Sequence, residues 1–172
     1  YVLELSSFQL DGMYKVRINI AVLLNITPDH LDRYNYELQN YIDAKFRITQ
    51  NQTSNDCFIY CYDDELLMKQ FEKFKTQAQL LPFSLTQSFA EGAYIENENL
   101  IINHNHNSFS MSIHDLALQG KHNQYNSMAA GLSARVLEVR KEIIRESLED
   151  FVNVEHRLEF VAKVHGIEFI ND

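Results

Sequence analysis

The chain has 172 residues, 45% of them hydrophobic, so it is long enough to bury the core of one globular domain. Its formal net charge is −9 and its basic residues are scattered, which argues against nucleic acid or an anionic membrane surface as a partner. No apolar run reaches the ~18 residues of a membrane span, and no signal-peptide pattern opens the chain, so we expect a soluble, cytoplasmic protein.

The first part of the sequence alternates between strand-like and helix-like segments. A strand is predicted at Tyr1–Leu5, and Ser6 with Gln9 forms the S-x-x-Q pattern that begins a capped helix. The continuous apolar run Ile18–Asn25 is typical of a strand that is covered on both faces, as in parallel sheets. A helix is expected over Tyr36–Asn51, because apolar residues repeat there at the spacing of one helical face.

The middle of the chain continues this alternation and then changes in character. A strand, a helix and a strand are expected at Asp56–Cys61, Asp63–Phe74 and Gln79–Phe83. From Ala93 to Ile113, short runs of alternating polarity and a turn near Asn97-Glu98-Asn99 predict a small antiparallel β unit. Cys57 and Cys61 lie too far apart along one strand to form a disulfide, so we expect buried free thiols.

The last part of the sequence is predicted to contain two helices and a hairpin. The helices are expected at His122–Glu138 and Arg140–Phe151, and the strands at Leu158–Val164 and Ile167–Ile170. The hairpin would turn at His165-Gly166. Together these elements indicate an α/β fold: a central parallel sheet flanked by helices, with a small antiparallel β subsheet.

Polar residues follow the first two predicted strands, at the edge where an open α/β sheet binds its ligands. Glu4 comes near the end of the first strand, and the second strand leads into NITPDHLDRY, which places His30 beside Asp29 and Asp32. A carboxylate at the end of an apolar strand is costly unless a metal ion or another partner compensates it, so Glu4 is a candidate ligand. His30 is a second candidate at this edge, although a loop histidine is more often hydrogen-bonded than a ligand. Helix-dipole, loop and capping roles are the alternatives for these residues.

Two further features are candidates for the same edge. Lys45 follows His30 by fifteen residues and would ordinarily extend its ammonium group to water. A lysine beside a metal would have to lose its positive charge, which carbamylation by carbon dioxide achieves, although the residues alone do not point to it. Asn123 and Asn126 share one face near a helix start, where amides can orient a ligand; ordinary capping explains them equally well.

Five segments, taken together, resemble a known family. They are ELSSFQL, NITPDHLDRY, YIDAKFRI, GKHNQYNSMAA and EHRLEFV, and they are similar in order and spacing to the central domain of the Mur ligases. The resemblance covers essentially the whole chain, and ELSSFQL and DHLDRY are most similar to the member that adds D-glutamate. It implies a P-loop-type central ATP-binding domain at 1–155, incomplete because its N-terminal phosphate-loop segment is missing, and a junction at 156–172 that leads to an absent C-terminal domain.

The resemblance also implies roles for individual residues. Glu4, His30 and a carbamylated Lys45 would hold Mg2+, and His30 and Lys45 would also be catalytic. The remaining residues would bind the nucleotide: Asn123, Asn126, Arg157 and Asp172.

The implied reaction is an ATP-dependent ligation in bacterial peptidoglycan synthesis. ATP would phosphorylate the carboxylate of UDP-N-acetylmuramoyl-L-alanine, and the amine of D-glutamate would attack the resulting acyl phosphate. ATP and Mg2+ are the implied cofactors, the two substrates are the implied partners, and neither nucleic acid nor a membrane is expected. As a fragment of the central domain, the chain alone is not expected to catalyse the reaction.

Three other interpretations remain open. A relative of folylpolyglutamate synthase or cyanophycin synthetase would share the modified lysine but would not be expected to carry ELSSFQL and DHLDRY. A non-catalytic binding module would keep the fold, but the candidate metal residues Glu4, His30 and Lys45 are all present. A metal-dependent phosphohydrolase would require an Asp-rich or His-rich cluster that the sequence lacks.

Overall fold

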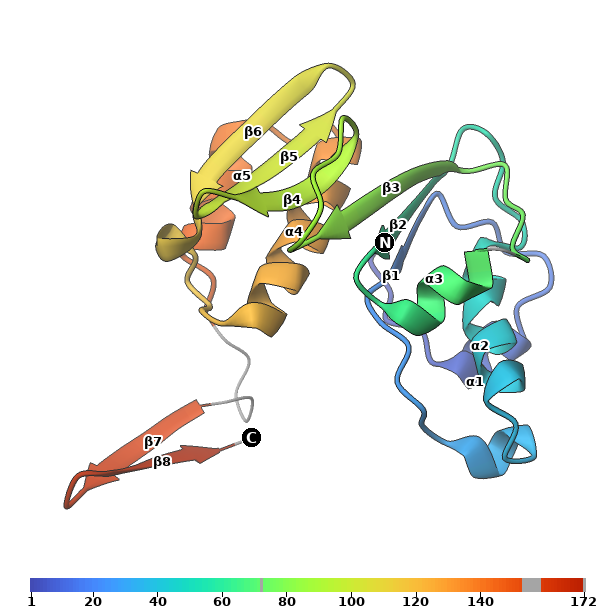
Figure 1. Cartoon of the computed structure of the whole chain (residues 1–172), viewed down its shortest axis with the longest axis horizontal. Coiled ribbons are helices and arrows are strands. Elements are labelled where there is room, and N and C mark those ends of the chain that lie inside the picture. The colour runs from blue at the N-terminus through green and yellow to red at the C-terminus, as the bar shows by residue number, and fades with distance from the viewer. Residues whose placement is uncertain (72, 153–158, 172) are drawn as a thin grey trace.

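The computed structural model describes residues 1–71, 73–152 and 159–171 (Figure 1). A six-stranded sheet crosses it in the order β1-β2-β3-β4-β5-β6, and helices cover both of its faces (Figure 1). The strands are β1 (Ile20–Leu23), β2 (Cys57–Cys61), β3 (Gln79–Ser84), β4 (Gly92–Glu96), β5 (Asn99–His104) and β6 (Asn107–Ser112). Within the described ranges, no helix has the length and hydropathy needed to cross a bilayer.

The sheet combines a parallel and an antiparallel part. β1, β2 and β3 pair in parallel, and β4 joins the edge of β3 in parallel at Phe83 and Ala93. β4, β5 and β6 pair antiparallel, and positive φ angles at Asn97 and Glu98 form the turn between β4 and β5. The predicted α/β class and the predicted antiparallel unit are confirmed. This unit continues the main sheet instead of forming a separate one.

The five residues of β2 divide the core into two halves. Cys57, Ile59 and Cys61 point to the face covered by α4 (Lys121–Val136) and α5 (Lys141–Glu149). Phe58 and Tyr60 point to the opposite face, where α2 (Leu38–Phe46) and α3 (Glu65–Phe71) pack. Every residue of the strand is therefore buried, which explains its unbroken apolar sequence.

The two cysteines are buried free thiols, as predicted. Burial raises the pKa of both thiols, that of Cys61 to about 11. A thiol with a raised pKa is a poor nucleophile, so these residues act as core side chains.

The helices begin and end close to their predicted positions. Ser6 and Gln9 form the predicted capping box at the start of α1 (Ser7–Asp11): the amide of Gln9 donates to the Ser6 hydroxyl, and the Gln9 side chain accepts from the Ser6 amide. The helix predicted over Tyr36–Asn51 is shorter, because α2 tightens into the 3-10 turn η2 (Arg47–Thr49). Another 3-10 turn, η1 (Leu31–Tyr34), follows β1, and η3 (Ile113–Asp115) follows β6.

The strand predicted at Tyr1–Leu5 is wrong for this structure. The segment pairs with no strand among the described residues, and the side chains of Tyr1, Val2 and Leu3 are exposed. An apolar segment becomes a strand only when a neighbouring strand accepts and donates its backbone hydrogen bonds. Glu4 therefore does not lie at the end of a strand in this structure.

The C-terminal hairpin is present as a separate two-stranded sheet. β7 (Glu159–Val164) pairs antiparallel with β8 (Ile167–Asn171), and the predicted turn at His165-Gly166 is confirmed by positive φ angles at both residues. The predicted first residue of this hairpin, Leu158, lies outside the described residues, and so does the expected domain boundary at 155 and 156.

Candidate functional site

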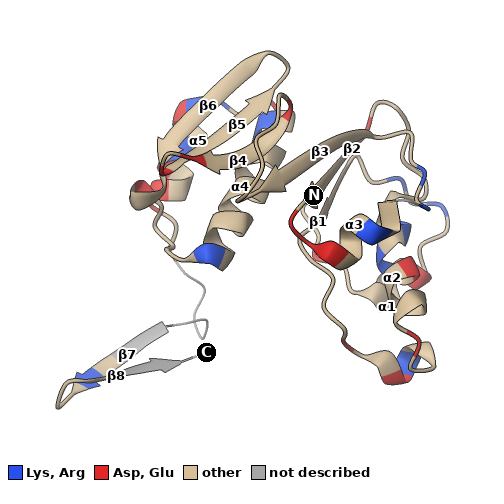
Figure 2. Ribbon diagram, in the orientation of Figure 1, with Lys and Arg blue, Asp and Glu red and all other residues tan. Residues whose placement is uncertain are grey.

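The carboxyl ends of β1, β2 and β3 lie at one edge of the sheet, because these strands run parallel. Ligands of open α/β folds bind outside this edge. Three connections leave from it: the loop from β1 towards His30, the Asp63-Asp64 step from β2 into α3, and the loop after Ser84 at the end of β3. Figure 2 shows acidic residues where β2 leads into α3. We refer to this region as the carboxyl edge.

Asp63 is the most highly connected carboxylate of the carboxyl edge. Its Oδ1 accepts from the hydroxyls of Ser84 (2.6 Å) and Thr86 (2.8 Å). Its Oδ2 accepts from the amide of Leu85 (2.7 Å) and the hydroxyl of Tyr125 (2.8 Å). Burial alone would raise the pKa of Asp63, but these four hydrogen bonds outweigh it and hold the pKa below its usual range.

Asp64 connects two other segments of the same edge. Its Oδ2 accepts from the amide of Ile26 (2.9 Å), in the loop that leads from β1 to His30. Its Oδ1 accepts from the amide of Leu67 (2.8 Å) and so caps the first turn of α3. One carboxylate thus fixes both a helix start and the loop that carries a candidate ligand.

The start of α4 reaches the carboxyl edge through Tyr125. The Tyr125 hydroxyl donates a hydrogen bond to the Asp63 carboxylate. Burial is the main cause that raises the pKa of the Tyr125 phenol, and the Asp63 carboxylate is the second. Asn123 and Asn126, the predicted ligand-orienting amides, flank Tyr125 on the same helix; Asn123 donates to the carbonyl of Gln119 (2.9 Å), and Asn126 is exposed. Among the described residues, no side chain caps the N-terminal end of α4, so its first amides can bind an anion.

His30 and Lys45 are connected by a series of ring contacts. The His30 ring lies 5.4 Å from Phe8, and Phe8 stacks on Tyr34 at 5.9 Å. Tyr34 meets Tyr41 edge to face at 5.5 Å, and Nζ of Lys45 lies 5.1 Å from the centre of the Tyr41 ring. This series joins α1, η1 and α2, so the two candidate residues stand on one packed unit.

The remaining candidate residues are Glu4, Arg157 and Asp172. Glu4 is exposed in the extended segment before α1, without a hydrogen bond or ion pair to another described residue. Arg157 and Asp172 lie outside the described residues. The convergence of Glu4, His30 and Lys45 at one edge of the sheet stays a prediction.

The candidate metal ligands Glu4, His30 and Lys45 can be compared with the ligands that Mg2+ requires. Within the described part of the chain, no three His, Cys, Asp or Glu side chains are close enough together to hold a metal ion. Mg2+, however, is usually bound by one or two carboxylates together with water and substrate phosphates, so a complete protein cage is not required. The exposed imidazole of His30 offers a ring nitrogen, which suits Mg2+ less well than oxygen. The exposed carboxylate of Glu4 fits the preference of Mg2+ for oxygen ligands. An unmodified Lys45 ammonium group does not.

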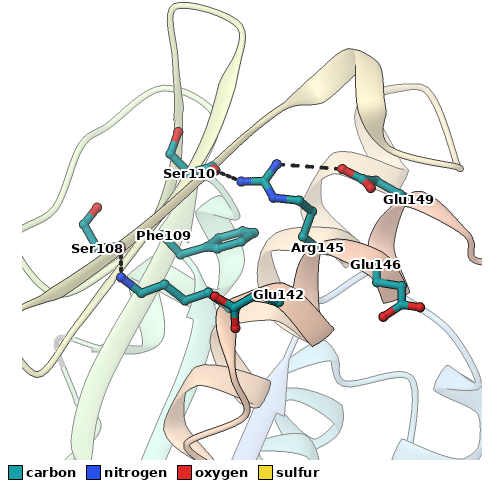
Figure 3. Close-up of a pocket in the computed structure, with 8 residues that line it drawn as sticks. Ser108, Phe109, Ser110, Glu142, Arg145, Glu146 and Glu149 are labelled. Atoms are coloured by element: carbon teal, nitrogen blue, oxygen red, sulfur yellow. Dashed lines mark hydrogen bonds and ion pairs between the residues drawn. The ribbon is translucent and has the colours of Figure 1, made fainter.

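A groove of about 360 Å³ lies away from this edge, between β6 and α5 (Figure 3). Its basic groups are already engaged: Nζ of Lys141 donates to the carbonyl of Ser108 and the guanidinium of Arg145 to that of Ser110, both at 2.5 Å (Figure 3). Arg145 also lies over the ring of Phe109, at 5.4 Å. The side chains of α5 that line the groove therefore cover the outer edge of strand β6, and this role explains their position.

Sequence reasoning missed the connecting roles of Asp63 and Tyr125. In the sequence, Asp63 is only the first residue of a predicted helix, and Tyr125 lies between the two candidate asparagines without a role of its own. The available signal was the position of Asp63 two residues after a fully buried strand, where a carboxylate requires donors. Those donors lie 21 to 62 residues away and become visible only in the fold.

Comparison with known proteins identifies the relatives of the chain. The family model described as the Mur ligase middle domain matches residues 1–134. The UDP-N-acetylmuramoylalanine--D-glutamate ligase of Christiangramia forsetii is 54% identical over 172 residues, which are all of this chain and 39% of that protein. The chain thus spans well under half the length of this relative.

Solved structures share the fold at lower sequence identity. A UDP-N-acetylmuramoyl-L-alanyl-D-glutamate--2,6-diaminopimelate ligase aligns with a TM-score of 0.71 and 24% identity, covering 93% of this chain and 34% of that one. MurF ligase from Thermotoga maritima in complex with ADP aligns with a TM-score of 0.65 and 16% identity, covering 96% of this chain and 38% of that one. At this identity the likeness concerns the fold alone.

Proposed function

The chain belongs to the Mur ligase family, and on that premise we propose that it is the central domain of an ATP-dependent ligase that adds D-glutamate to UDP-N-acetylmuramoyl-L-alanine. The observation that carries the proposal is the 54% identity, over the whole chain, to a protein named for that activity. We assign residues 1–155 to the central domain and 156–172 to a junction. Because the chain spans 39% of the relative, the activity belongs to the longer protein, in the bacterial cytoplasm.

In the proposed reaction, ATP phosphorylates the carboxylate of UDP-N-acetylmuramoyl-L-alanine, and the amine of D-glutamate attacks the acyl phosphate. Most of the catalysis of such a transfer consists of positioning the reactants and stabilising charge on the phosphoryl oxygens. The carboxyl edge offers groups that could position the reactants and groups that could stabilise charge. Hydrogen bonds hold the loops that carry these groups in place.

We assign nucleotide binding to the start of α4. Its uncapped amides can bind phosphate oxygens, and Asn123 and Asn126 provide amide groups beside them. The ADP complex of a MurF ligase with the same fold supports a nucleotide in this family of structures. Arg157 and Asp172 are assigned to the nucleotide by resemblance.

We assign magnesium binding to Glu4, His30 and Lys45. When bound, Mg2+ would neutralise charge on the transferring phosphoryl group. Glu4 would contribute a carboxylate oxygen and His30 a ring nitrogen. Lys45, half-buried above Tyr41, would contribute only after carbamylation gives it anionic oxygens. His30 and Lys45 would also orient the reacting groups and so act as catalytic residues.

This assignment can be tested in the full-length protein that contains the chain. ADP release is measured with ATP, Mg2+, UDP-N-acetylmuramoyl-L-alanine and D-glutamate. Glu4→Ala, His30→Ala and Lys45→Ala should each lower the rate by roughly 100-fold or more, as expected when a charge-stabilising group is lost. Lys69→Ala, an exposed position on α3, is the matched control and should keep the wild-type rate. Three variants with near wild-type rates would refute the assigned site.

A further inference from the structure

We propose that Asp63 and Asp64 are positioning residues that hold the two ligand-binding segments of the carboxyl edge in register with each other. The inference rests on the proposed function, because it assumes that the His30 loop and the start of α4 bind the metal and the nucleotide. Neither aspartate would touch substrate. Each acts through the segment that it holds.

Asp64 fixes the loop that carries His30. The loop leaves β1 and passes the amide of Ile26, which donates to Oδ2 of Asp64 at 2.9 Å. Ile26 is buried, and its hydrogen bond to Asp64 is partly shielded from solvent. His30 follows four residues later with a left-handed backbone (φ 50°). Anchoring Ile26 therefore limits where the His30 imidazole can lie.

Asp63 fixes the start of α4. The hydrogen bond from the Tyr125 hydroxyl spans 62 positions, and the Tyr125 ring packs edge to face against Phe83 of β3 at 6.2 Å. Rotation or sliding of α4 would break this bond and move Asn123 and Asn126 together, because the three residues share little more than one turn of helix. The same carboxylate also holds the loop after β3 through its contacts with Ser84, Leu85 and Thr86.

The hydrogen bonds of both carboxylates favour a positioning role over metal coordination. Each oxygen of Asp63 accepts two hydrogen bonds, and each oxygen of Asp64 accepts a backbone N–H. A metal ion would have to displace these donors and leave them without acceptors. Asp63 and Asp64 are adjacent in sequence. Their hydrogen bonds therefore join the segments after β1 and β3 to the starts of α3 and α4.

Two conservative variants of the full-length protein separate positioning from general stability. Tyr125→Phe removes the hydroxyl and keeps the ring that packs on Phe83. Asp64→Ser keeps a hydroxyl that can cap Leu67 at the start of α3, but the shorter side chain cannot also reach the amide of Ile26. Tyr62→Phe is the matched control, since the Tyr62 hydroxyl makes no hydrogen bond to the described residues.

The kinetic measurement compares the concentrations of ATP and Mg2+ that the enzyme requires with its turnover number, kcat. Tyr125→Phe should raise the KM for ATP by about fivefold to tenfold, and Asp64→Ser should raise the Mg2+ concentration for half-maximal rate by a similar factor, as expected for the loss of one hydrogen bond. The kcat at saturation should stay within about twofold, which a general loss of folded enzyme would not allow. Unchanged KM and Mg2+ requirements would overturn the inference.

Hydrogen exchange tests the same inference without turnover. In Asp64→Ser, the amide of Ile26 should exchange at least about tenfold faster while the amide of Leu67 stays protected. If the wild-type protein is inactive with D-glutamate, the proposed function fails but this measurement still decides the positioning role. Unchanged exchange at Ile26 would refute that role, whatever reaction the protein catalyses.

Discussion

Arg17 and Asp56 form a two-point ion pair at the amino ends of β1 and β2, with Nε 2.8 Å from Oδ2 and Nη2 3.0 Å from Oδ1. The Asp56 side chain is fully buried, and Thr53 donates to it from both its amide (2.7 Å) and its hydroxyl (2.9 Å). Asn19 adds a weaker contact at 3.3 Å. This pair fixes the edge of the sheet opposite to the carboxyl edge.

Replacement of Asp56 by Ala should destabilise the fold by about 2–4 kcal/mol, because it leaves the Thr53 amide and the guanidinium without their acceptor. Urea unfolding followed by circular dichroism measures this free energy. Asp115→Ala, an exposed carboxylate without a described partner, is the control and should change the free energy by less than about 0.5 kcal/mol. Equal effects of the two variants would show that the pair is not a structural anchor.

The same residue predicts a pH dependence of stability. The hydrogen bond from Arg17 is the main cause that holds the pKa of Asp56 well below its usual range, against the opposing effect of burial. The unfolded chain, with an aspartate pKa of about 3.9, therefore takes up a proton before the folded protein does. The contribution of Asp56 is present above that pH and is lost as the pH falls below it.

Urea midpoints of the wild type and of Asp56→Ala, compared from neutral pH down to about pH 3, measure this dependence. The difference between the two proteins should be largest at neutral pH and should shrink below about pH 4. A difference that stays constant over the whole range would contradict the assigned pKa shift.

Gly92, at the start of β4, should not tolerate a side chain. Its backbone has a φ of 137°, and a Cβ there would press against the carbonyl oxygen of Pro82 on β3. Because that neighbour is backbone in a paired strand, Gly92→Ala should lower the free energy of unfolding by about 2–4 kcal/mol. Gly12→Ala, where a Cβ meets only an ordinary contact, is the control. Equal unfolding midpoints for the two variants would contradict the predicted clash at Gly92.

Arg145 should protect the outer edge of β6 from association with other strands. Its guanidinium occupies the carbonyl of Ser110, which would otherwise be free to pair with another chain. Arg145→Ala should therefore self-associate at lower protein concentration than the wild type in light scattering. Arg140→Ala removes the same charge from an exposed position beside the start of α5 and should remain like the wild type. If Arg140→Ala associates equally, the loss of any exposed arginine and not the opening of the strand edge is responsible.

Sequence patterns predicted those elements whose formation depends on local signals. The unbroken apolar run of β2 and the capping box at Ser6 and Gln9 are of this kind, and both are confirmed. The strand at Tyr1–Leu5 failed because a strand needs a partner, and hydrophobicity alone does not supply one. The 3-10 turn after α2 was missed since it shares the periodicity signals of a helix end.

The candidate site was predictable only in part, for a similar reason. Asn123 and Asn126 could be placed at a helix start from the sequence, and the helix is there. The ring contacts that join His30 to Lys45 pass through Phe8, which precedes both of them in the chain. No spacing rule predicts such a connection, because it depends on how α1 packs against its neighbours.

The most direct test of the account is the identity of the product made by the full-length protein. UDP-N-acetylmuramoyl-L-alanine, ATP and Mg2+ are incubated with D-glutamate, or separately with L-glutamate, glycine, L-lysine or meso-diaminopimelate, and products are identified by mass spectrometry. The account predicts a product carrying one added glutamate, formed with D-glutamate only and with one ADP released per product. A product with another amino acid, or ADP release without any amide product, would contradict it.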